Sequence, residues 1–160
     1  MPRYMTQQGH QIITDEIDHL WRVERPRVVD EVSEAADLGD RSENAAYIYG
    51  KRRLRHVDSR LRYLRRKIDG VTVVNLDEML QFTDIRFGAV VVLEEEDGVQ
   101  KIWRLVDKDE SEPAKGRISV QSPIGRALLG HEVGDCVTVH LPRGSVDYEV
   151  LDIRYGLEGP

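Results

Sequence analysis

The sequence contains one cysteine, few aromatic residues and no long hydrophobic run. Cys136 is the only cysteine, which excludes an internal disulfide or a zinc site built from thiolates, and we expect its side chain to lie in the core. No stretch approaches the ~20 apolar residues of a membrane-spanning helix, and residues 1–9 contain no apolar segment typical of a signal peptide. We therefore expect a cytoplasmic protein with no membrane partner.

The sequence also lacks the usual motifs of a self-contained enzyme. It has no glycine-rich phosphate loop, no serine–histidine–aspartate arrangement and no cysteine–histidine pair. Its five histidines show no i, i+4 pairing and have no set of carboxylates nearby, so they do not predict a metal site. The sequence therefore favours a protein without an enclosed active site of its own.

Charge is distributed unevenly along the 160 residues, although the net charge is only −6. Residues 1–38 hold 4 basic and 8 acidic side chains, residues 39–70 hold 10 and 4, and residues 71–160 hold 9 and 17. A pI of 5.4 argues against nucleic-acid binding by the whole chain, but binding follows the local electrostatic field. The excess of basic residues in segment 39–70 therefore predicts that this segment contacts a polyanion.

Hydrophobic spacing predicts two long helices that pair with each other. In residues 47–68 apolar side chains recur at steps of three, four and seven, which is the heptad pattern of a coiled coil. Residues 10–37 show similar spacing with a slip near Pro26, where the missing backbone donor predicts a local bend. Helices of roughly 30 residues would give a hairpin on the order of 45 Å long. The predicted seam residues are Ile13, Ile17, Leu20, Trp21, Val28, Val32, Ala35, Tyr47, Leu54, Val57, Leu61, Leu64 and Ile68.

A short turn near residues 38–44 joins the helices and carries two acidic side chains. Gly39 suits the end of the first helix, and Asp40 suits the N-cap of the second. Asp40 and Glu43 have the spacing of a capping box, and the residue pattern alone favours that structural role. The alternative is that the two carboxylates hold Mg²⁺, which takes one or two carboxylates and keeps water or phosphate in its remaining positions. Because two ligands bind Mg²⁺ weakly, a partner would have to complete such a site.

A run of basic residues follows in the second helix. Acidic side chains of the first helix would face it in an antiparallel hairpin, which predicts ion pairs for about half of the arginines. The remainder predict an outward stripe that binds an RNA or DNA backbone, or alternatively an acidic protein surface. The basic residues are Lys51, Arg52, Arg53, Arg55, Arg60, Arg62, Arg65, Arg66 and Lys67.

After residue 70 the helical spacing gives way to short β-rich segments separated by turn signals. Ser122 and Pro123 predict the cap and first turn of one short helix. We therefore expect an α+β protein with an N-terminal coiled-coil domain at 1–74 and a compact domain at 75–160. The expected strands are 71–74, 89–93, 102–106, 117–120, 137–141 and 148–153.

Several long motifs resemble the bacterial Gre transcript cleavage factors, and among them the GreB type. The block at 35–47 contains Gly-Asp-Arg-Ser-Glu-Asn, and it is followed by arginine-rich segments at 51–55 and 58–64. The resemblance spans nearly the whole chain. Further matching segments are Leu20-Trp21-Arg22, Glu24-Arg25-Pro26, Ile118-Ser119-Val120-Gln121-Ser122-Pro123, Arg126-Ala127-Leu128-Leu129-Gly130 and Glu132-Val133-Gly134-Asp135.

The resemblance implies an antiparallel coiled coil and a C-terminal domain similar in fold to the FKBP prolyl isomerases. In the Gre family the C-terminal domain docks on the rim of RNA polymerase, and the coiled coil enters the secondary channel. The tip acids there help to hold Mg²⁺ and to orient a water that cleaves the 3′ segment of backtracked nascent RNA.

By motif position, the resemblance implies catalytic and metal-binding roles for Asp40 and Glu43, supported by Arg41, Ser42 and Asn44. It implies an RNA-binding stripe at Lys51, Arg52, Arg53, Arg55, Arg60 and Arg62. It implies polymerase docking at Ser122, Pro123, Ile124 and Arg126.

Three functional hypotheses follow. The first is a monomeric transcription elongation factor that is no enzyme by itself but a catalytic cofactor, stimulating RNA cleavage by RNA polymerase and rescuing arrested complexes. The second is a regulator that occupies the secondary channel without driving cleavage. The third is a prolyl isomerase, against which the few aromatic residues of the second domain argue, because they are too sparse to line a proline pocket.

Overall fold

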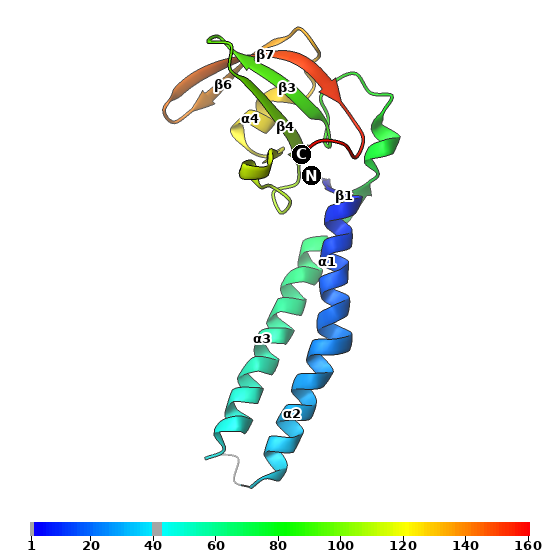
Figure 1. The fold of residues 1–160 in the computed structure, drawn as a ribbon, viewed down its shortest axis with the longest axis vertical. Helices are drawn as coiled ribbons and strands as arrows, with labels where there is room; N and C mark the ends of the chain where they lie inside the picture. Colours follow the sequence, from blue (N-terminus) through cyan, green and yellow to red (C-terminus); the bar gives the residue numbers. More distant parts are fainter. Residues whose placement is uncertain (1, 40–42) are drawn as a thin grey trace. The chain divides into compact units, whose positions relative to one another are not determined.

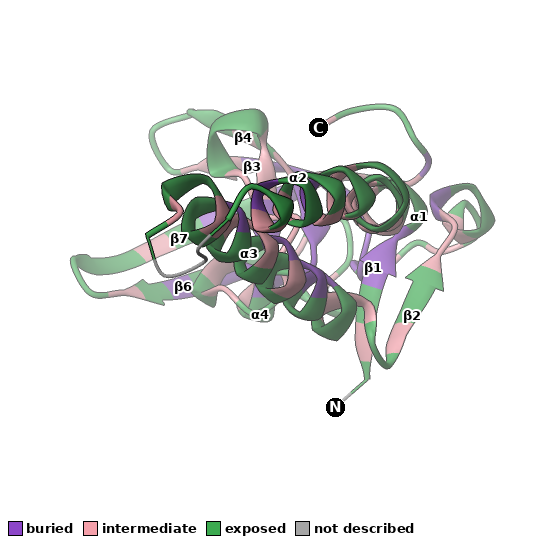
Figure 2. Ribbon diagram, turned by 90° about the horizontal axis from the view of Figure 1, so that it is seen from below, coloured by how far each residue is buried: buried purple, intermediate pink, exposed green. Residues whose placement is uncertain are grey.

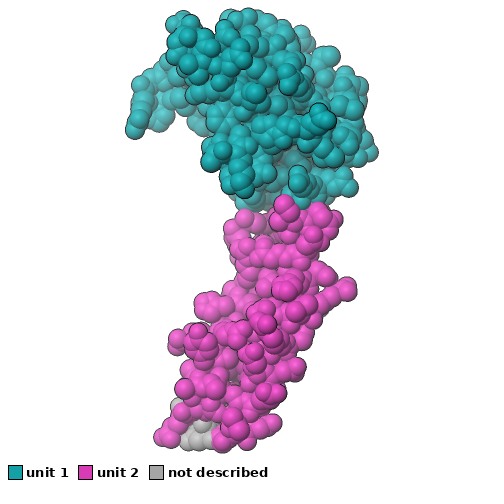
Figure 3. All heavy atoms as spheres, in the orientation of Figure 1, with its two compact units in different colours: residues 1–9, 70–160 teal, residues 10–69 magenta. Residues whose placement is uncertain are grey.

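The computed structural model describes residues 2–39 and 43–160 (Figure 1). It confirms the predicted α+β fold, with a helical hairpin and a domain built on a β-sheet. The chain forms two compact units, one of residues 10–69 and the other of residues 1–9 together with 70–160 (Figure 3). This division differs from a boundary at 74/75, because β1 (Arg3–Thr6) pairs in parallel with β2 (Val71–Val74) and draws both segments into the second unit.

The hairpin consists of two helical arms. The first arm contains α1 (Gln7–His19), a π-helical turn η1 (Leu20–Glu24) and α2 (Arg25–Asp37), and the second arm is α3 (Ala45–Ile68). Buried positions form narrow bands on these helices, and most of their remaining surface is exposed (Figure 2). The heptad pattern in α3 is confirmed at Val57, Leu61 and Leu64, which are all buried.

The bend expected at Pro26 takes the form of the π-helical turn just before it. The backbone N–H of Arg25 donates to the carbonyl of Leu20, five residues earlier, and Pro26 has no N–H to donate. The wider turn contains one extra residue, which moves side chains away from the positions that heptad counting gives them. Trp21 is 51% exposed and Val23 is 52% exposed, so the prediction of Trp21 in the seam is wrong.

The packing of α2 on α3 explains why a glycine, Gly50, stands in the interior of α3. Glycine destabilises a helix interior by about 1 kcal/mol relative to alanine, so its presence there requires a compensating reason. A Cβ atom at this position would lie 2.8 Å from Cγ2 of Val32, too close for two carbon atoms. Gly50 is buried, and it lets the two helices approach each other at this level of the hairpin.

The second unit is built on a five-stranded sheet in the order β5-β4-β3-β7-β6. Neighbouring strands are antiparallel except β4 and β5. All five strands expected after residue 75 are present, and α4 (Pro123–Leu128) packs next to β6. The bounds are β3 (Val90–Glu95), β4 (Gln100–Val106), β5 (Arg117–Ser119), β6 (Cys136–Leu141) and β7 (Gly144–Arg154), with short 3₁₀ turns η2 (Leu76–Met79) and η3 (Pro113–Lys115). The core is formed by Ile85, Ala89, Val91, Leu93, Leu105, Ile118, Leu128, Val137, Val139, Tyr148 and Val150.

Cys136 is exposed, so its predicted core position is wrong. It begins β6, in which exposed and buried residues alternate. Val137 and Val139 occupy the buried side, so the odd-numbered positions face the core and Cys136 lies on the other side of the strand.

A partly buried carboxylate holds the start of α1 within the second unit. Glu110 accepts hydrogen bonds from the backbone N–H of Thr6, at 3.0 Å, and from the Thr6 hydroxyl. The Thr6 hydroxyl oxygen in turn accepts the N–H of Gly9, at 3.0 Å, and a Cβ on Gly9 would collide with the Glu110 carboxylate. Arg3 adds ion pairs to Asp107 and Asp109. The first turn of α1 is therefore fixed by specific contacts.

We expect the Glu110→Gln variant to gain stability relative to the wild type as pH rises. Burial raises the pKa of the Glu110 carboxyl, and the hydrogen bonds from Thr6 offset only part of that effect. A raised folded-state pKa means that the carboxyl contributes fully below the unfolded value of about 4.5 and that this contribution is lost as pH rises through the folded pKa. Glutamine does not titrate. Urea unfolding at pH 4 and pH 7.5 measures the difference, with exposed Glu96→Gln as the matched control; a difference independent of pH would contradict the prediction.

Candidate functional site

The turn between α2 and α3 carries the predicted catalytic residues. Asp40, Arg41 and Ser42 lie outside the described residues, so the site is built from the residues on either side of them. Gly39 has a φ of 134°, in the region that favours glycine, as expected for a residue that follows a helix. On the other side of the turn, the described residues resume at Glu43.

Asn44, and not Asp40, is the N-cap of α3. Oδ1 of Asn44 accepts the backbone N–H of Tyr47 at 3.0 Å, and Nδ2 donates to the carbonyl of Ala35 at 2.5 Å. The side chain therefore caps one helix and ties it to the end of the other. The capping-box interpretation of Asp40 and Glu43 is wrong, because Glu43 precedes the cap instead of occupying the third helical position. A role of Asn44 toward RNA stays a prediction.

Glu43 is exposed, and its carboxylate makes no hydrogen bond or ion pair with any residue that the structure describes. Exposed carboxylate oxygens are the hard ligands that Mg²⁺ prefers, so the donor chemistry of Glu43 fits the predicted ion. Within residues 2–39 and 43–160, no group of three or more His, Cys, Asp or Glu side chains could hold a metal ion.

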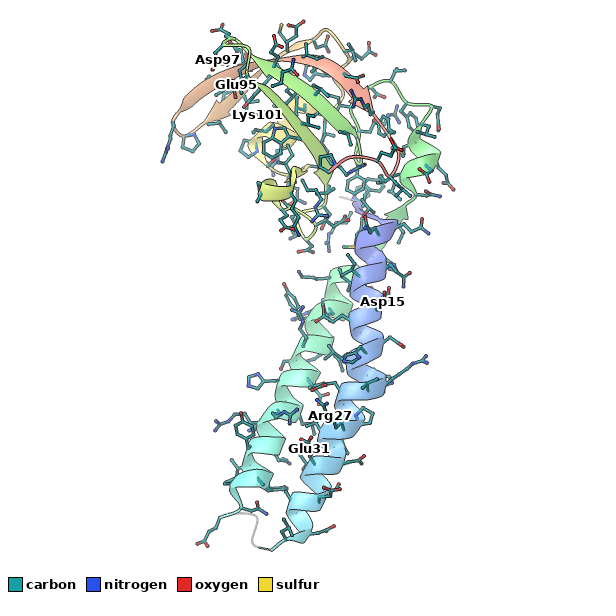
Figure 4. All side chains as sticks on the ribbon, in the orientation of Figure 1. Asp15, Arg27, Glu31, Glu95, Asp97 and Lys101 are labelled. Atoms are coloured by element: carbon teal, nitrogen blue, oxygen red, sulfur yellow. The ribbon has the colours of Figure 1, made fainter. Side chains whose placement is uncertain are left out.

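Two of the six predicted RNA-binding residues form ion pairs across the hairpin. Arg53 donates to Glu31 at 2.7 Å and to Glu24 at 3.5 Å, and Arg60 donates to Glu16 at 2.7 Å. The hydrogen bond to Glu16 raises the pKa of the Arg60 guanidinium. Glu31 also lies 4.0 Å from Arg27 on the same helix (Figure 4). Ion pairing with the first arm, the alternative to RNA binding, therefore applies to these two arginines.

Four of the remaining arginines of α3 form an outward surface that we call the outer arginine stripe, comprising Arg52, Arg55, Arg62 and Arg66. These residues are exposed and lie three, four or seven apart, which places them on one side of α3. Arg62 donates to the hydroxyl of Ser59 at 3.1 Å. Throughout the part of the chain that the structure describes, none of the four has a carboxylate within ion-pair distance. Their charge is available to a partner.

Aromatic rings accompany several cations on the hairpin. The Lys51 ammonium lies 5.7 Å from the ring centre of Tyr47. The guanidinium groups of Arg25 and Arg65 lie 5.5 and 5.3 Å from the Trp21 ring. The sequence did not predict this cluster, because the heptad pattern placed Trp21 in the seam. The irregular spacing near Pro26 was the signal that could have indicated a surface position for Trp21. Tyr49 is 65% exposed beside a groove between α2 and α3.

In the predicted docking segment, two residues have structural roles and two are exposed. Ser122 caps α4 by accepting the N–H of Gly125 at 3.0 Å and donates to the carbonyl of Ser119 at 2.6 Å. Ile124 packs against the core of the second unit. Pro123 and Arg126 are exposed and present the surface of this segment.

The aromatic side chains of the second unit pack separately. The Phe87 ring lies 5.9 Å from that of Tyr4, the Phe82 ring lies 6.4 Å from that of Tyr155, and Tyr148 is buried in the core. These contacts give the prolyl isomerase hypothesis no support. No helix among the described residues is long and apolar enough to cross a membrane.

Two family models match the chain. One, described as the N-terminal part of transcription elongation factors, matches residues 3–73. The other, described as the C-terminal part of the transcription elongation factors GreA/GreB, matches residues 80–155. Together they cover most of both units.

Similar proteins include the transcription elongation factor GreB of Yersinia pestis, which is 49% identical over 95% of this chain and 88% of its own length. GreB of Haemophilus influenzae is 46% identical over 95% of this chain and 96% of its own length. GreB of Pseudomonas putida is 45% identical over 95% of this chain and 93% of its own length. Among solved structures, the GreA factor homolog Gfh1 of Thermus thermophilus covers 96% of this chain and 99% of its own, at 22% identity and a TM-score of 0.43.

Proposed function

The chain belongs to the GreA/GreB family of transcription elongation factors, and we propose that it rescues arrested RNA polymerase by stimulating cleavage of backtracked nascent RNA. It is a transcription elongation factor that acts on RNA polymerase. In this proposal it is not an enzyme by itself but a catalytic cofactor of the polymerase. It works in the cytoplasm, as a monomer.

The observation that carries the proposal is the exposed and unbonded carboxylate of Glu43 at the end of a long helical hairpin. Asn44 fixes the start of α3, so the carboxylate lies one residue before the N-cap of that helix. With Asp40 nearby in sequence, the tip supplies two carboxylates but not a complete metal site. A helical hairpin whose tip supplies only part of a metal site is suited to enter a channel of the polymerase in which the remaining ligands lie.

In this mechanism Asp40 and Glu43 would hold Mg²⁺ jointly with the polymerase. Bound there, the ion would lower the pKa of an attacking water and stabilise negative charge on the phosphate that is cleaved. The two carboxylates orient that water by accepting its hydrogen bonds. Arg41 and Ser42, which flank the acids in sequence, help to position the RNA.

The outer arginine stripe would bind the 3′ segment of the RNA through its phosphates. Arginine suits this role because its guanidinium makes paired hydrogen bonds to phosphate oxygens. Lys51 adds charge at the end of α3 that is nearest the tip, whereas Arg53 and Arg60 contribute mainly by holding the two arms together. The second unit would dock on the rim of the polymerase's secondary channel through Pro123 and Arg126, with Ser122 and Ile124 shaping that surface.

A cleavage assay with a defined backtracked complex tests the proposal. RNA polymerase carrying a 5′-labelled transcript, backtracked by a few nucleotides, is incubated with and without the protein in Mg²⁺. We expect the transcript to become shorter from its 3′ end and then to be extended when nucleotides are added. If the protein binds the complex and changes elongation while the transcript keeps its length, it is a channel-occupying regulator and the cleavage proposal is wrong.

A further inference from the structure

Trp21 is a large aromatic residue that the fold places on the surface of the hairpin. The π-helical turn moves it out of the seam, and half of its side chain is exposed. A single exposed apolar residue is ordinary on a protein surface and needs no explanation. Here, however, guanidinium groups from both arms of the hairpin lie within 5.5 Å of the indole ring centre.

The charges around Trp21 do not cancel. Arg25 forms an ion pair with Asp58 at 2.8 Å, and Arg22 forms one with Asp18 at 2.7 Å. Arg65 has no carboxylate within ion-pair distance in the described segments. The indole therefore lies beside an uncompensated cation.

Arg65 ends a row of residues along one side of α3. Successive members are three, four or seven positions apart, so they share that side of the helix. We call this row the α3 track, comprising Tyr47, Lys51, Arg55, Arg62 and Arg65. Asp58 is the only acid between Tyr47 and Arg65, and its charge is offset by Arg25. An aromatic ring therefore stands at each end of a cationic row, Tyr47 at one end and Trp21 at the other.

The length of the α3 track matches a short single strand of RNA. Tyr47 and Arg65 are five helical turns apart, which corresponds to about 27 Å. A strand with stacked bases rises about 3.4 Å per nucleotide, so about eight nucleotides would cover this distance.

We propose that Trp21, held by Arg25 and Arg65, is a stacking site for unpaired RNA bases that lie about eight nucleotides beyond the tip of the hairpin. The site rests on the proposed function, because an extruded RNA 3′ segment is its ligand. Cationic rows with exposed aromatic rings are the general means of binding single strands, in which phosphates contact the cations and bases stack on the rings. The site makes the factor more effective on RNA that has been extruded far.

The proposal predicts an effect of Trp21→Ala that depends on backtracking distance. Two complexes are prepared, one backtracked by about 3 nucleotides and one by about 12. Loss of one base-stacking contact should slow cleavage in the longer complex about tenfold, and cleavage in the shorter complex should stay unchanged. Trp21→Phe keeps a ring and should restore most of the rate. Val23→Ala, which truncates another exposed residue of the same π-helical turn, is the matched control.

Fluorescence of the isolated protein tests the stacking directly. The chain has two tryptophans, so the difference between wild type and Trp21→Phe isolates the emission of Trp21. We expect a 12-nucleotide oligouridylate to quench this emission and an abasic oligomer of equal length to quench it much less.

The inference is overturned if Trp21→Ala slows both complexes equally or neither, or if the abasic oligomer quenches as strongly as oligouridylate. It is also overturned if Trp21→Ala weakens binding to polymerase that carries no extruded RNA, because Trp21 would then contact protein. Absence of cleavage by the wild type in both complexes would instead refute the proposed function, and the fluorescence result would still decide whether the isolated hairpin stacks bases.

Discussion

Replacing Asp40 by asparagine, or Glu43 by glutamine, is expected to slow stimulated RNA cleavage by about 100-fold or more. Each substitution keeps the size of the side chain and removes one negative charge. An amide oxygen binds Mg²⁺ more weakly than a carboxylate, so the ion would be retained less often in the cleavage geometry. Glu43 makes no bond with the described residues that its loss could disturb, so the fold should not change.

Single-turnover cleavage of one backtracked complex at saturating protein measures this effect, and competition with labelled wild-type protein measures polymerase binding. Binding should stay within about fivefold, because a surface ion pair contributes at most about 1 kcal/mol. Higher Mg²⁺ concentrations should restore part of the activity by mass action. Asp37→Asn, which neutralises an exposed acid at the end of α2, is the matched control and should cleave normally. Loss of binding in both tip variants, with normal cleavage at saturation, would contradict the assigned roles.

Leu61→Ala is expected to destabilise the hairpin by about 3 kcal/mol. Leu61 is 2% exposed, and the buried apolar set of the hairpin is small, so a cavity there removes a large share of the packing energy. That set consists of Val28, Ala35, Val57, Leu61 and Leu64. For a unit of this size the loss corresponds to a fall in melting temperature of more than about 10 °C.

Far-UV circular dichroism during heating detects the helical transition, and fluorescence of Trp103, measured with Trp21 replaced by phenylalanine, reports the sheet domain independently. The helical transition should move while that of the sheet domain stays in place. Tyr63→Ala removes a larger side chain from an exposed position of the same helix and should cost less than about 1 kcal/mol. Equal shifts in Leu61→Ala and Tyr63→Ala would show that Leu61 does not pack as described.

The sequence predicted the elements whose signal is local and periodic. The heptad in α3 and the β-rich segments of the sheet needed only spacing and turn residues to be recognised. Heptad counting assumes a constant number of residues per turn, so the π-helical turn before Pro26 displaced Trp21 from its predicted place. The pairing of β1 with β2 joins residues far apart in sequence, and a four-residue strand carries too little pattern to reveal it.

The candidate site was predictable in part for the same reason. The tip motif drew attention to Asp40 and Glu43, but aspartate and asparagine are comparable N-caps, so spacing could not choose between Asp40 and Asn44. The choice depends on the bond from Asn44 to Ala35, which forms only when the two arms pack. The division of the arginines into paired and unpaired ones depends likewise on the stagger of the arms, which brings Glu31 to Arg53 and Glu16 to Arg60.

The contact of Gly50 with Val32 has an evolutionary consequence. The two positions share one fixed volume between the arms, so a substitution at either one is tolerated only when the other compensates. A larger residue at position 50 is accommodated only if the residue at position 32 is smaller. This double substitution would raise the helix propensity of α3 without increasing the distance between the two helices. These two positions should therefore vary together during descent.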